Sequence, residues 1–466
     1  GKRSLACCSS FFFEQLPKFK FSFTTRRILR MFKSVCISVL FAFYLLWITD
    51  YILLSIFPNC YERTFQQDID FKGIKDVSSV CLENEIPELI YNISGEQNRK
   101  SHGILMKQNI NMAKIDQQYI CKHWAVVNAI SNPTSAVRQI ASDNKWCLVI
   151  VADINSISKD AYLTELGCRG RRIVFLNIAD QDKLFSALST AIPWRHIGRK
   201  NIGYLFAIQN GAELIWDFDY NNQGILDIGS INNQNTMSVL QRCGGHHKLF
   251  NHYPYFGVNE TYIWPRGFPL EFARDRSTIP GLCKANISFK SVGVIQTVAD
   301  KEPDVDATFR FTREYPITFE ATEKFSFILV PRFSYCPFNE RATLWTQQAF
   351  LYMALPTSVH SRVSDVWRSY IAQLFFHRKR INLIFSPPCV VQTNSDRNIL
   401  EDFQVEMNIY KKSNSLIDFL QTFDFKHNVT LEYLYEELYR RHFITLEDVY
   451  FIRIWTKSYR EVSGTK

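Results

Sequence analysis

The sequence lacks the short motifs that identify several common enzyme classes. It has no G-x-S-x-G turn, no P-loop and no G-x-G-x-x-G, which argues against α/β-hydrolases, P-loop NTPases and dinucleotide-binding dehydrogenases. It also has no Cys-x-x-Cys pair, so neither a zinc ribbon nor a thioredoxin-like redox site is indicated. Internal repeats and low-complexity runs are lacking as well. Candidate catalytic and binding residues are therefore sought at the strand ends and among the charged residues that follow them.

Net charge is small over most of the chain. The 466 residues carry +9, from 54 basic and 45 acidic side chains. The first 34 residues account for +7, because eight lysines and arginines there stand against Glu14 alone. The remaining +2 gives no basis for nucleic-acid binding by the main body.

One apolar run, residues 35–57, is long enough for a transmembrane helix and contains a single charge, Asp50. Its length and basic flank favour a membrane span over a buried core helix. The run lies too far from the N-terminus for a cleavable signal, which indicates a signal anchor. The basic tail, residues 1–34, predicts a cytoplasmic N-terminus and hence a type II membrane protein.

Glycosylation sequons support a lumenal location for the region after this run. Four Asn-x-Ser/Thr triplets follow residue 57 and none precedes it; their asparagines are Asn92, Asn259, Asn286 and Asn428. Nine of the twelve cysteines lie in the same region, where an oxidising lumen permits disulfides. Because nine is odd, at least one of these cysteines is unpaired or bonds another chain.

The lumenal region divides into three parts by composition. Residues 58–120 are polar and show little periodicity, which is typical of a stem. Strand and helix patterns then alternate, over residues 124–130, 135–142, 147–152, 172–176 and 200–209. This alternation predicts a doubly wound α/β sheet within residues 121–395. Helical spacing in residues 396–466 predicts a small helical C-terminal extension.

The most informative stretch is Asn201–Asp219, where a helix pattern leads into a short apolar strand that ends on two acids. Ligands of parallel α/β sheets bind beyond the carboxyl ends of the strands, where Asp217 and Asp219 are expected. Residues i and i+2 of an extended chain share a face, so both carboxylates can reach one Mn²⁺ or Mg²⁺ ion. Such an ion would bridge the phosphates of a nucleotide diphosphate. Asp-x-Asp occurs three times in the chain, so only the strand context distinguishes this one.

Further motifs occur in order along residues 121–395. They are WAVV (124–127), RKNIGYLFAIQNGA (199–212), WDFD (216–219), WPRGFPL (264–270), PDVDA (303–307), CPFN (336–339) and RVSDVWR (362–368). Together they resemble the plant STELLO family of Golgi proteins and its relatives in other eukaryotes, whose lumenal region resembles glycosyltransferases of the reversibly glycosylated polypeptide type.

The resemblance implies a GT-A-like fold and a location in the Golgi membrane. It also implies a nucleotide diphosphate sugar as donor and a glycan or glycoprotein as acceptor. Membrane-bound glycosyltransferases are implied as partners, because plant members of the family associate with cellulose synthase complexes. The chain departs from the family after Asp219, where further acids are frequent and this sequence continues with Tyr220, Asn221 and Asn222. Two carboxylates remain, and asparagine can supply a metal-ligating oxygen.

Arg266 is a candidate contact to phosphate or sugar. It lies in a loop whose backbone is restricted by Pro265 and given conformational freedom by Gly267. Trp264 offers a stacking surface beside it. A packed turn is the alternative interpretation of this loop.

Two other sets of charged residues are candidate substrate contacts. Asp304 and Asp306 lie in an extended segment and could face an acceptor hydroxyl, although a solvated edge is the alternative. Arg362, Asp365 and Arg368 are spaced three apart on a predicted helix and share a face. We interpret Asp365 as a catalytic base flanked by two substrate-binding arginines; a surface ion-pair ladder is the alternative.

Two functions from different classes fit these patterns. The first is a metal-dependent type II Golgi glycosyltransferase. The second is a catalytically silent GT-A-like module that binds membrane glycosyltransferases and controls their assembly or trafficking. Fold similarity does not distinguish them. The lack of further acids directly after Asp219 favours the catalytically silent module.

Overall fold

A computed structural model describes residues 121–167, 172–227, 235–258, 262–313, 316–319, 326–392, 398–424 and 429–464. The predicted tail, membrane run and stem lie outside the described residues, as do Asn92, Asn259 and Asn428. No helix among the described residues is both long and apolar enough to span a bilayer. Asn286 lies on an edge strand and is exposed, and its glycosylation stays a prediction.

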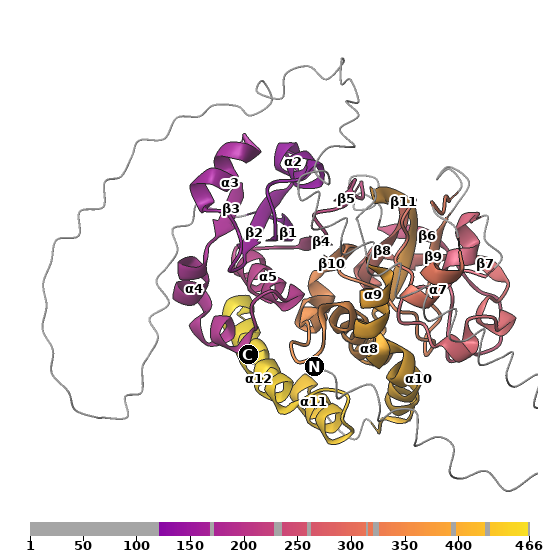
Figure 1. Ribbon diagram of the computed structural model, residues 1–466. Coiled ribbons are helices and arrows are strands. Elements are labelled where there is room, and N and C mark those ends of the chain that lie inside the picture. The colour runs from indigo at the N-terminus through magenta and orange to yellow at the C-terminus, as the bar shows by residue number, and fades with distance from the viewer. Residues whose placement is uncertain are drawn as a thin grey trace, which may run out of the picture. The chain divides into compact units, whose positions relative to one another are not determined.

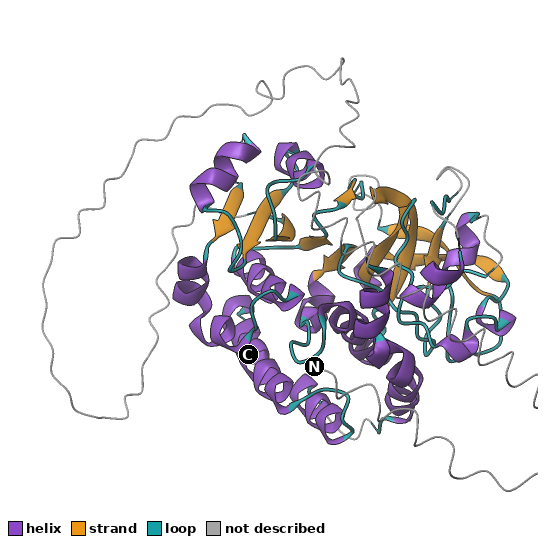
Figure 2. Ribbon diagram, viewed as in Figure 1, coloured by secondary structure: helices purple, strands orange, loops and turns teal. Residues whose placement is uncertain are grey.

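Eleven strands of the described chain form one mixed sheet (Figures 1 and 2). The main path runs β3 (Ile173–Leu176), β2 (Cys147–Ala152), β1 (His123–Ala129), β4 (Leu214–Phe218), β10 (Ala342–Thr346), β8 (Val292–Asp300), β11 (Asn382–Gln392), β9 (Phe327–Leu329), β6 (Thr236–Arg242) and β7 (Leu282–Ser288). The short strand β5 (Asn222–Gln223) pairs with β11. A large central sheet combined with helices fits the predicted GT-A-like α/β class.

Strands β3, β2, β1 and β4 run parallel, and helices cover both of their faces. Helices α2 (Ser135–Ser142) and α3 (Lys159–Leu166) pack on one face, and α4 (Ile178–Ala191) and α5 (Lys200–Gln209) pack on the other. These strands are mostly apolar because both of their faces are buried; the polar exceptions include Asn128 in β1 and Asp217 in β4. This half of the sheet therefore has the doubly wound arrangement that the alternating patterns predict.

The other half of the sheet joins the parallel half through an antiparallel pair of strands. Strand β10 pairs with β4, which places Thr343 opposite Asp217, and β10 pairs antiparallel with β8 as well. The short helix α7 (Ala307–Thr312) and the 3₁₀ helix η9 (Gln347–Met353) lie in the connections of this half. The 19-residue helix α8 (Ser361–Lys379) is almost wholly buried against it. Its N-terminus lies near the carboxyl end of β4, where the candidate site forms.

The C-terminal region is helical, as expected, and it packs against the rest of the described chain. It contains α9 (Ile399–Val405), α10 (Met407–Thr422), α11 (Leu431–Arg440) and α12 (Leu446–Ser463). Figure 1 shows α12 beside α4 and α5, and α10 beside α8. Their apolar side chains belong to the same hydrophobic core as the sheet, so this region completes the domain.

Two disulfides occur among the described residues, Cys121–Cys147 and Cys243–Cys283. Cys336 is buried and unpaired, and Cys389 is unpaired and half-buried. Paired cysteines fit the oxidising compartment that the sequence predicts.

Candidate functional site

A pocket of about 180 Å³ opens at the carboxyl end of β4. Its polar walls come from α5, the segment after β4, the segment before β10 and the first two turns of α8; they include Lys200, Asp219, Glu340, Arg341, Arg362 and Asp365. A smaller cavity of about 20 Å³ shares Arg266 and Arg341 with it and is also lined by Asp304 and Asn339. The position matches the rule that ligands of such sheets bind beyond the carboxyl ends of their strands.

Asp217 lies inside β4 and is fully buried. Its Oδ1 accepts a hydrogen bond from Lys200 Nζ at 3.0 Å, and its Oδ2 accepts one from Arg368 Nη1 at 3.0 Å. Arg368 also donates to the hydroxyl oxygen of Tyr204 at 3.3 Å and lies 5.0 Å from the ring centroid of Trp345. Asp217 and Arg368 line neither of the two cavities. In this structure they form a buried ion pair behind the pocket wall.

Asp219 is the member of the Asp-x-Asp pair that faces the pocket. It follows the last residue of β4, and its side chain is 16% exposed. Its Oδ1 lies 3.4 Å from the backbone nitrogen of Asn221, and its Oδ2 lies 3.8 Å from Nε of Arg341. These contacts are weaker than those of Asp217, so Asp219 is the more available oxygen donor.

The carboxylates therefore fit a divalent cation only in part. Both oxygens of Asp217 are already bonded to cationic side chains, which leaves Asp219 as the ligand that fits among the predicted pair. The described residues contain no group of three or more His, Cys, Asp or Glu side chains arranged to hold a metal. The manganese or magnesium site stays a prediction.

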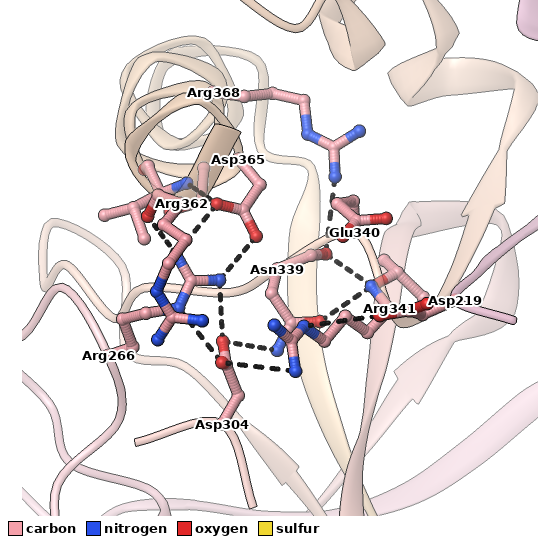
Figure 3. A network of polar contacts seen from close by, with 12 residues as sticks. Asp219, Arg266, Asp304, Asn339, Glu340, Arg341, Arg362, Asp365 and Arg368 are labelled. Carbon is pink, nitrogen blue, oxygen red and sulfur yellow. Dashed lines mark hydrogen bonds and ion pairs between the residues drawn. The ribbon is translucent and has the colours of Figure 1, made fainter. Parts of the chain in front are cut away.

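Arg266 is held between two carboxylates (Figure 3). Its Nε and Nη2 donate to Asp304 at 3.0 and 2.9 Å, and its Nη1 and Nη2 donate to Asp365 at 3.0 and 2.6 Å. The side chain is 1% exposed, although the residue lines both cavities. Such bidentate pairing fixes the guanidinium rigidly and consumes the donors that a phosphate would need.

The first two turns of α8 place Arg362 and Asp365 at the pocket, as their spacing predicts. Arg362 Nε donates to Glu406 Oε1 at 2.7 Å and lies 3.3 Å from Asp402 Oδ1, so the C-terminal helices neutralise it. Both oxygens of Asp365 accept hydrogen bonds from Arg266. A general base needs a lone pair directed at its substrate, and those of Asp365 are directed at Arg266.

Two further predicted contacts, Trp264 and Asp306, have structural partners. Trp264 is buried and donates from Nε1 to Asp306 at 2.7 Å, and its ring meets Phe309 edge to face. Asp306 is the N-cap of α7 and accepts from the backbone nitrogen of Phe309 at 2.9 Å. Burial raises the pKa of Asp306. Neither Trp264 nor Asp306 lines either cavity. The packed-turn alternative therefore describes Trp264, whereas the solvated-edge alternative for Asp304 and Asp306 is wrong, because both side chains are buried.

Asp304 has the opposite electrostatic environment. Burial alone would raise its pKa, but the guanidinium groups of Arg266 and Arg341 outweigh burial and hold the pKa well below its ordinary value. Its carboxylate also accepts from Asn339 Nδ2 at 3.0 Å. Asp304 is therefore an anion at neutral pH that positions two arginines.

Glu340 is a site residue that the sequence analysis missed. It lines the pocket, is 6% exposed and shares a hydrogen bond with Lys200 through Oε2. Burial raises the pKa of Glu340 to about 7, even with the ammonium of Lys200 beside it. Perturbed carboxyl groups of this kind in a pocket are typical of acid–base catalysts. The CPFN motif ends one residue before it, which was the only available signal.

Arg341 is the second missed residue, and it is the most loosely held arginine of the site. Figure 3 shows Arg341 between Asp304 and Asp219. Its Nη1 lies 3.9 Å from Asp304 Oδ1, and its Nε lies 3.8 Å from Asp219 Oδ2. Its Nη1 donates to Gln392 at 3.4 Å, whereas its buried Nε has no hydrogen-bond partner in the structure. Arg341 lines both cavities and is thus the best-placed cation for an incoming anion.

A sequence profile of the family described as STELLO glycosyltransferases matches residues 362–464, which cover α8 and the C-terminal helices. Two curated proteins of Arabidopsis thaliana are similar over longer stretches. "Probable glycosyltransferase STELLO1" is 28% identical over 267 residues, 54% of this chain and 33% of that protein. "Probable glycosyltransferase STELLO2" is 27% identical over 313 residues, 64% of this chain and 39% of that protein.

The chain spans about a third to two fifths of the length of the curated relatives it matches. The profile falls on the helix that carries Arg362 and Asp365 and on the helices that neutralise Arg362. These matches confirm that the chain is similar to proteins described as STELLO glycosyltransferases, as the motifs indicate.

Proposed function

We propose that this protein is a glycosyltransferase that binds a nucleotide diphosphate sugar in the pocket at the carboxyl end of β4. The observation that carries the proposal is the convergence there of Glu340, whose pKa is near neutrality, with Asp219 and the loosely held Arg341. Similarity to a family described as glycosyltransferases supports it. An acid–base group beside a cation and a lightly bonded carboxylate suits transfer from a diphosphate.

Glu340 is the residue to which we assign the catalytic base. In its ionised form it accepts the proton of the acceptor hydroxyl while the hydroxyl oxygen bonds to the anomeric carbon and the bond to the diphosphate breaks. Lys200 holds Oε2, so we assign Oε1 to the acceptor. A base whose pKa is near the working pH is ionised in much of the protein and is still basic enough to take the proton.

Arg341 takes the role of diphosphate contact in this proposal. Its fork of N–H donors suits two phosphate oxygens, and its present partners lie 3.4 to 3.9 Å away. Lys200 and Arg368 hold the strand-end carboxylate Asp217 in place, and Arg266 braces Asp304 against Asp365. These paired residues position the pocket walls rather than contact the donor.

A divalent cation belongs to the proposal with Asp219 as its protein ligand. When bound, Mn²⁺ or Mg²⁺ would neutralise charge that develops on the departing diphosphate. Asp217 would stay bonded to Lys200 and Arg368 and would not contact the ion.

The cellular setting is proposed from the sequence and the family resemblance. The basic tail and the apolar run of residues 35–57 support a type II anchor in the Golgi membrane with the described domain in the lumen. The acceptor would be a glycan or glycoprotein, and membrane-bound glycosyltransferases would be partners.

The alternative function is a catalytically silent module that controls the assembly or trafficking of such enzymes. One observation favours it: the charged groups Asp217, Arg266, Arg362 and Asp365 are saturated by partners within the protein. A site whose charges are balanced internally is stable without a donor.

Titration calorimetry distinguishes the two functions. We expect the full chain to bind one member of a panel of nucleotide diphosphate sugars, with higher affinity when Mn²⁺ is present. Arg341→Gln and Asp219→Asn should each weaken this binding at least tenfold. Asp418→Asn is the matched control, because Asp418 is a surface acid paired with Lys248 and lies outside the pocket.

Turnover completes the test. Glu340→Gln keeps an oxygen for Lys200 and should leave donor binding within about threefold while lowering transfer at least a hundredfold, since general bases contribute about 10²–10⁴ in rate. Donor binding by the folded protein without transfer to any acceptor would favour the silent module. Absence of donor binding would reject the enzyme.

A further inference from the structure

A second and larger pocket lies at the opposite end of α8. Its volume is about 460 Å³, and its walls are the end of β6, the segment after β9, the last turns of α8 and the start of β11. Twelve residues of α8 separate Asp365 at the first pocket from His377 at the second, a distance of about 18 Å along the axis. The two pockets are therefore distinct sites.

The lining of this second pocket is basic. Arg242, Arg332 and Arg380 contribute to it together with His377, and none of its described lining residues is Asp or Glu. Its volume falls within the range of roughly 300–1,000 Å³ of small-molecule sites.

His377 presents an unused hydrogen-bond donor. Its side chain is buried, with 7% exposure of the residue. The backbone nitrogen of Phe333 donates to Nδ1 at 3.3 Å, so the neutral ring carries its proton on Nε2. Nε2 has no hydrogen-bond partner in the structure. Burial, with Arg332 and Arg378 nearby, lowers the pKa of His377 to about 3, so the ring is neutral at physiological pH.

Arg242 contributes a second unused donor from a different element. It is the last residue of β6, and its Nε donates to the carbonyl oxygen of Gly244 at 3.0 Å. Its Nη1 is buried and has no hydrogen-bond partner among the residues that the structure describes. The turn that holds this guanidinium is constrained on one side by the Cys243–Cys283 disulfide. Both unpaired donors belong to residues that line this pocket, and such buried donors are costly unless a ligand supplies acceptors.

Complementarity to the helix dipole explains only part of this charge. Basic residues are favourable at a helix C-terminus, which accounts for Arg378 and Lys379 in the last turn of α8. Arg332 likewise donates from Nε to the carbonyl oxygen of His377 at 2.9 Å. Arg242 belongs to another element and reaches no carbonyl of α8 in the structure. The dipole therefore leaves the unpaired Nη1 of Arg242 and Nε2 of His377 unexplained.

We propose that this second pocket binds a small organic oxyanion, such as a phosphorylated or carboxylated sugar. Arg242, Arg380 and the Nε2–H of His377 hold the phosphate or carboxylate group. The amides of Gln241 and Asn382, which also line the pocket, contact the hydroxyls of the neutral body. This site does not depend on donor binding at β4.

Calorimetric titration of the full chain tests the site with inorganic phosphate, glucose 1-phosphate and glucuronate. We expect at least one of the two organic anions to bind more tightly than inorganic phosphate. Arg242→Gln and Arg380→Asn should each weaken that binding at least tenfold. Asn is chosen at position 380 because Arg380 has φ of 58°, a left-handed conformation that Asn tolerates.

The matched control is Arg378→Gln, which removes the same charge from an exposed residue that does not line the pocket. Its affinity should stay within twofold of the parent. Equal weakening by all three variants would mean a general field effect and would reject the site. Lack of binding of any probe by the folded parent would reject it too. Circular dichroism of each variant verifies that the fold is retained.

Discussion

At the scale of single residues, the charged side chains of the candidate site fall into two groups. Some are held in buried ion pairs, and others are available to a ligand. Asp217 and Arg266 are satisfied by neighbours within the protein, and Arg368 is ion-paired with Asp217, although its Nε has no hydrogen-bond partner among the described residues. Asp219 and Arg341 have longer contacts and face the pocket. Charge pairs that are buried together are costly to break, since removal of one partner leaves the other uncompensated.

Asp217→Asn should destabilise the fold by about 3–5 kcal/mol, because it leaves Lys200 and Arg368 without their shared anion. Asp219→Asn should change the free energy of unfolding by no more than about 0.5 kcal/mol, as is usual for lightly bonded positions. Urea denaturation of both variants without metal measures the difference. Equal stability of the two variants would contradict the structural role assigned to Asp217.

Glu340 predicts a specific dependence of stability on pH. Its pKa is about 7 in the folded protein against an ordinary value of 4.5, so the folded state binds the proton more tightly. Its contribution to stability is therefore complete below about pH 4.5 and is lost as the pH rises through about 7. Relative to the parent, Glu340→Gln should gain stability over this interval and then level off.

Chemical denaturation of parent and Glu340→Gln at half-unit steps from pH 4 to 8.5 measures this difference. A constant difference across the series would mean that Glu340 titrates with an ordinary pKa. It would then lose its support as the base.

At the scale of elements, α5 owes its position to close contact with the sheet. A Cβ atom at Gly203 would lie 2.6 Å from Cγ1 of Val126 and 2.8 Å from Cγ2 of Val151, on the neighbouring strands β1 and β2. Only glycine allows the helix to come this near. The contact places Lys200, at the first residue of α5, against Asp217.

Gly203→Ala should therefore destabilise the protein by about 1–3 kcal/mol through overpacking, despite the better helix propensity of alanine. Gly281→Ala is the matched control, because a Cβ atom there meets nothing within 4 Å. Thermal unfolding of both variants gives the comparison. A stabilised Gly203→Ala would mean that α5 sits farther from the sheet.

At the scale of the whole molecule, the C-terminal helices are part of the domain. Leu416, Leu434, Phe451 and Trp455 are buried in the core that also contains the sheet. Asp448 of α12 accepts hydrogen bonds from the backbone nitrogens of Thr357, at 2.6 Å, and Ser358, which lie just before α8. The C-terminus thereby holds the helix that carries the pocket residues Arg362 and Asp365.

Truncation after residue 395 should abolish cooperative folding, because it exposes this apolar surface and removes the partners of Arg362. Near-ultraviolet circular dichroism and limited proteolysis of the truncated chain test this expectation. A stable, protease-resistant fragment would restore the view of residues 396–466 as a separate extension.

Local patterns were sufficient to predict the elements around β4. The helix at 135–142, the strand at 147–152 and the helix at 200–209 agree with the structure, because each is a strong apolar pattern with clear end signals. The pairing of charges was beyond prediction. Nothing local indicates that Lys200 and Arg368 meet at Asp217, or that Glu340 lies beside Lys200, 140 positions away.

The site predictions share that limit. Arg266, Arg362 and Asp365 lie at the pocket as expected, but their partners Asp304, Glu406 and Arg266 come from distant segments. Those partners decide whether a charge is available to a substrate. Spacing within a motif predicts proximity, whereas availability depends on tertiary contacts.

The measurement that tests the account most directly is a crystal structure of the protein with Mn²⁺ and the nucleotide diphosphate that the binding panel selects. The account predicts the diphosphate against Arg341, the ion on Asp219, and Asp217 still bonded to Lys200 and Arg368. A nucleotide bound elsewhere, or an ion held by Asp217, would contradict it.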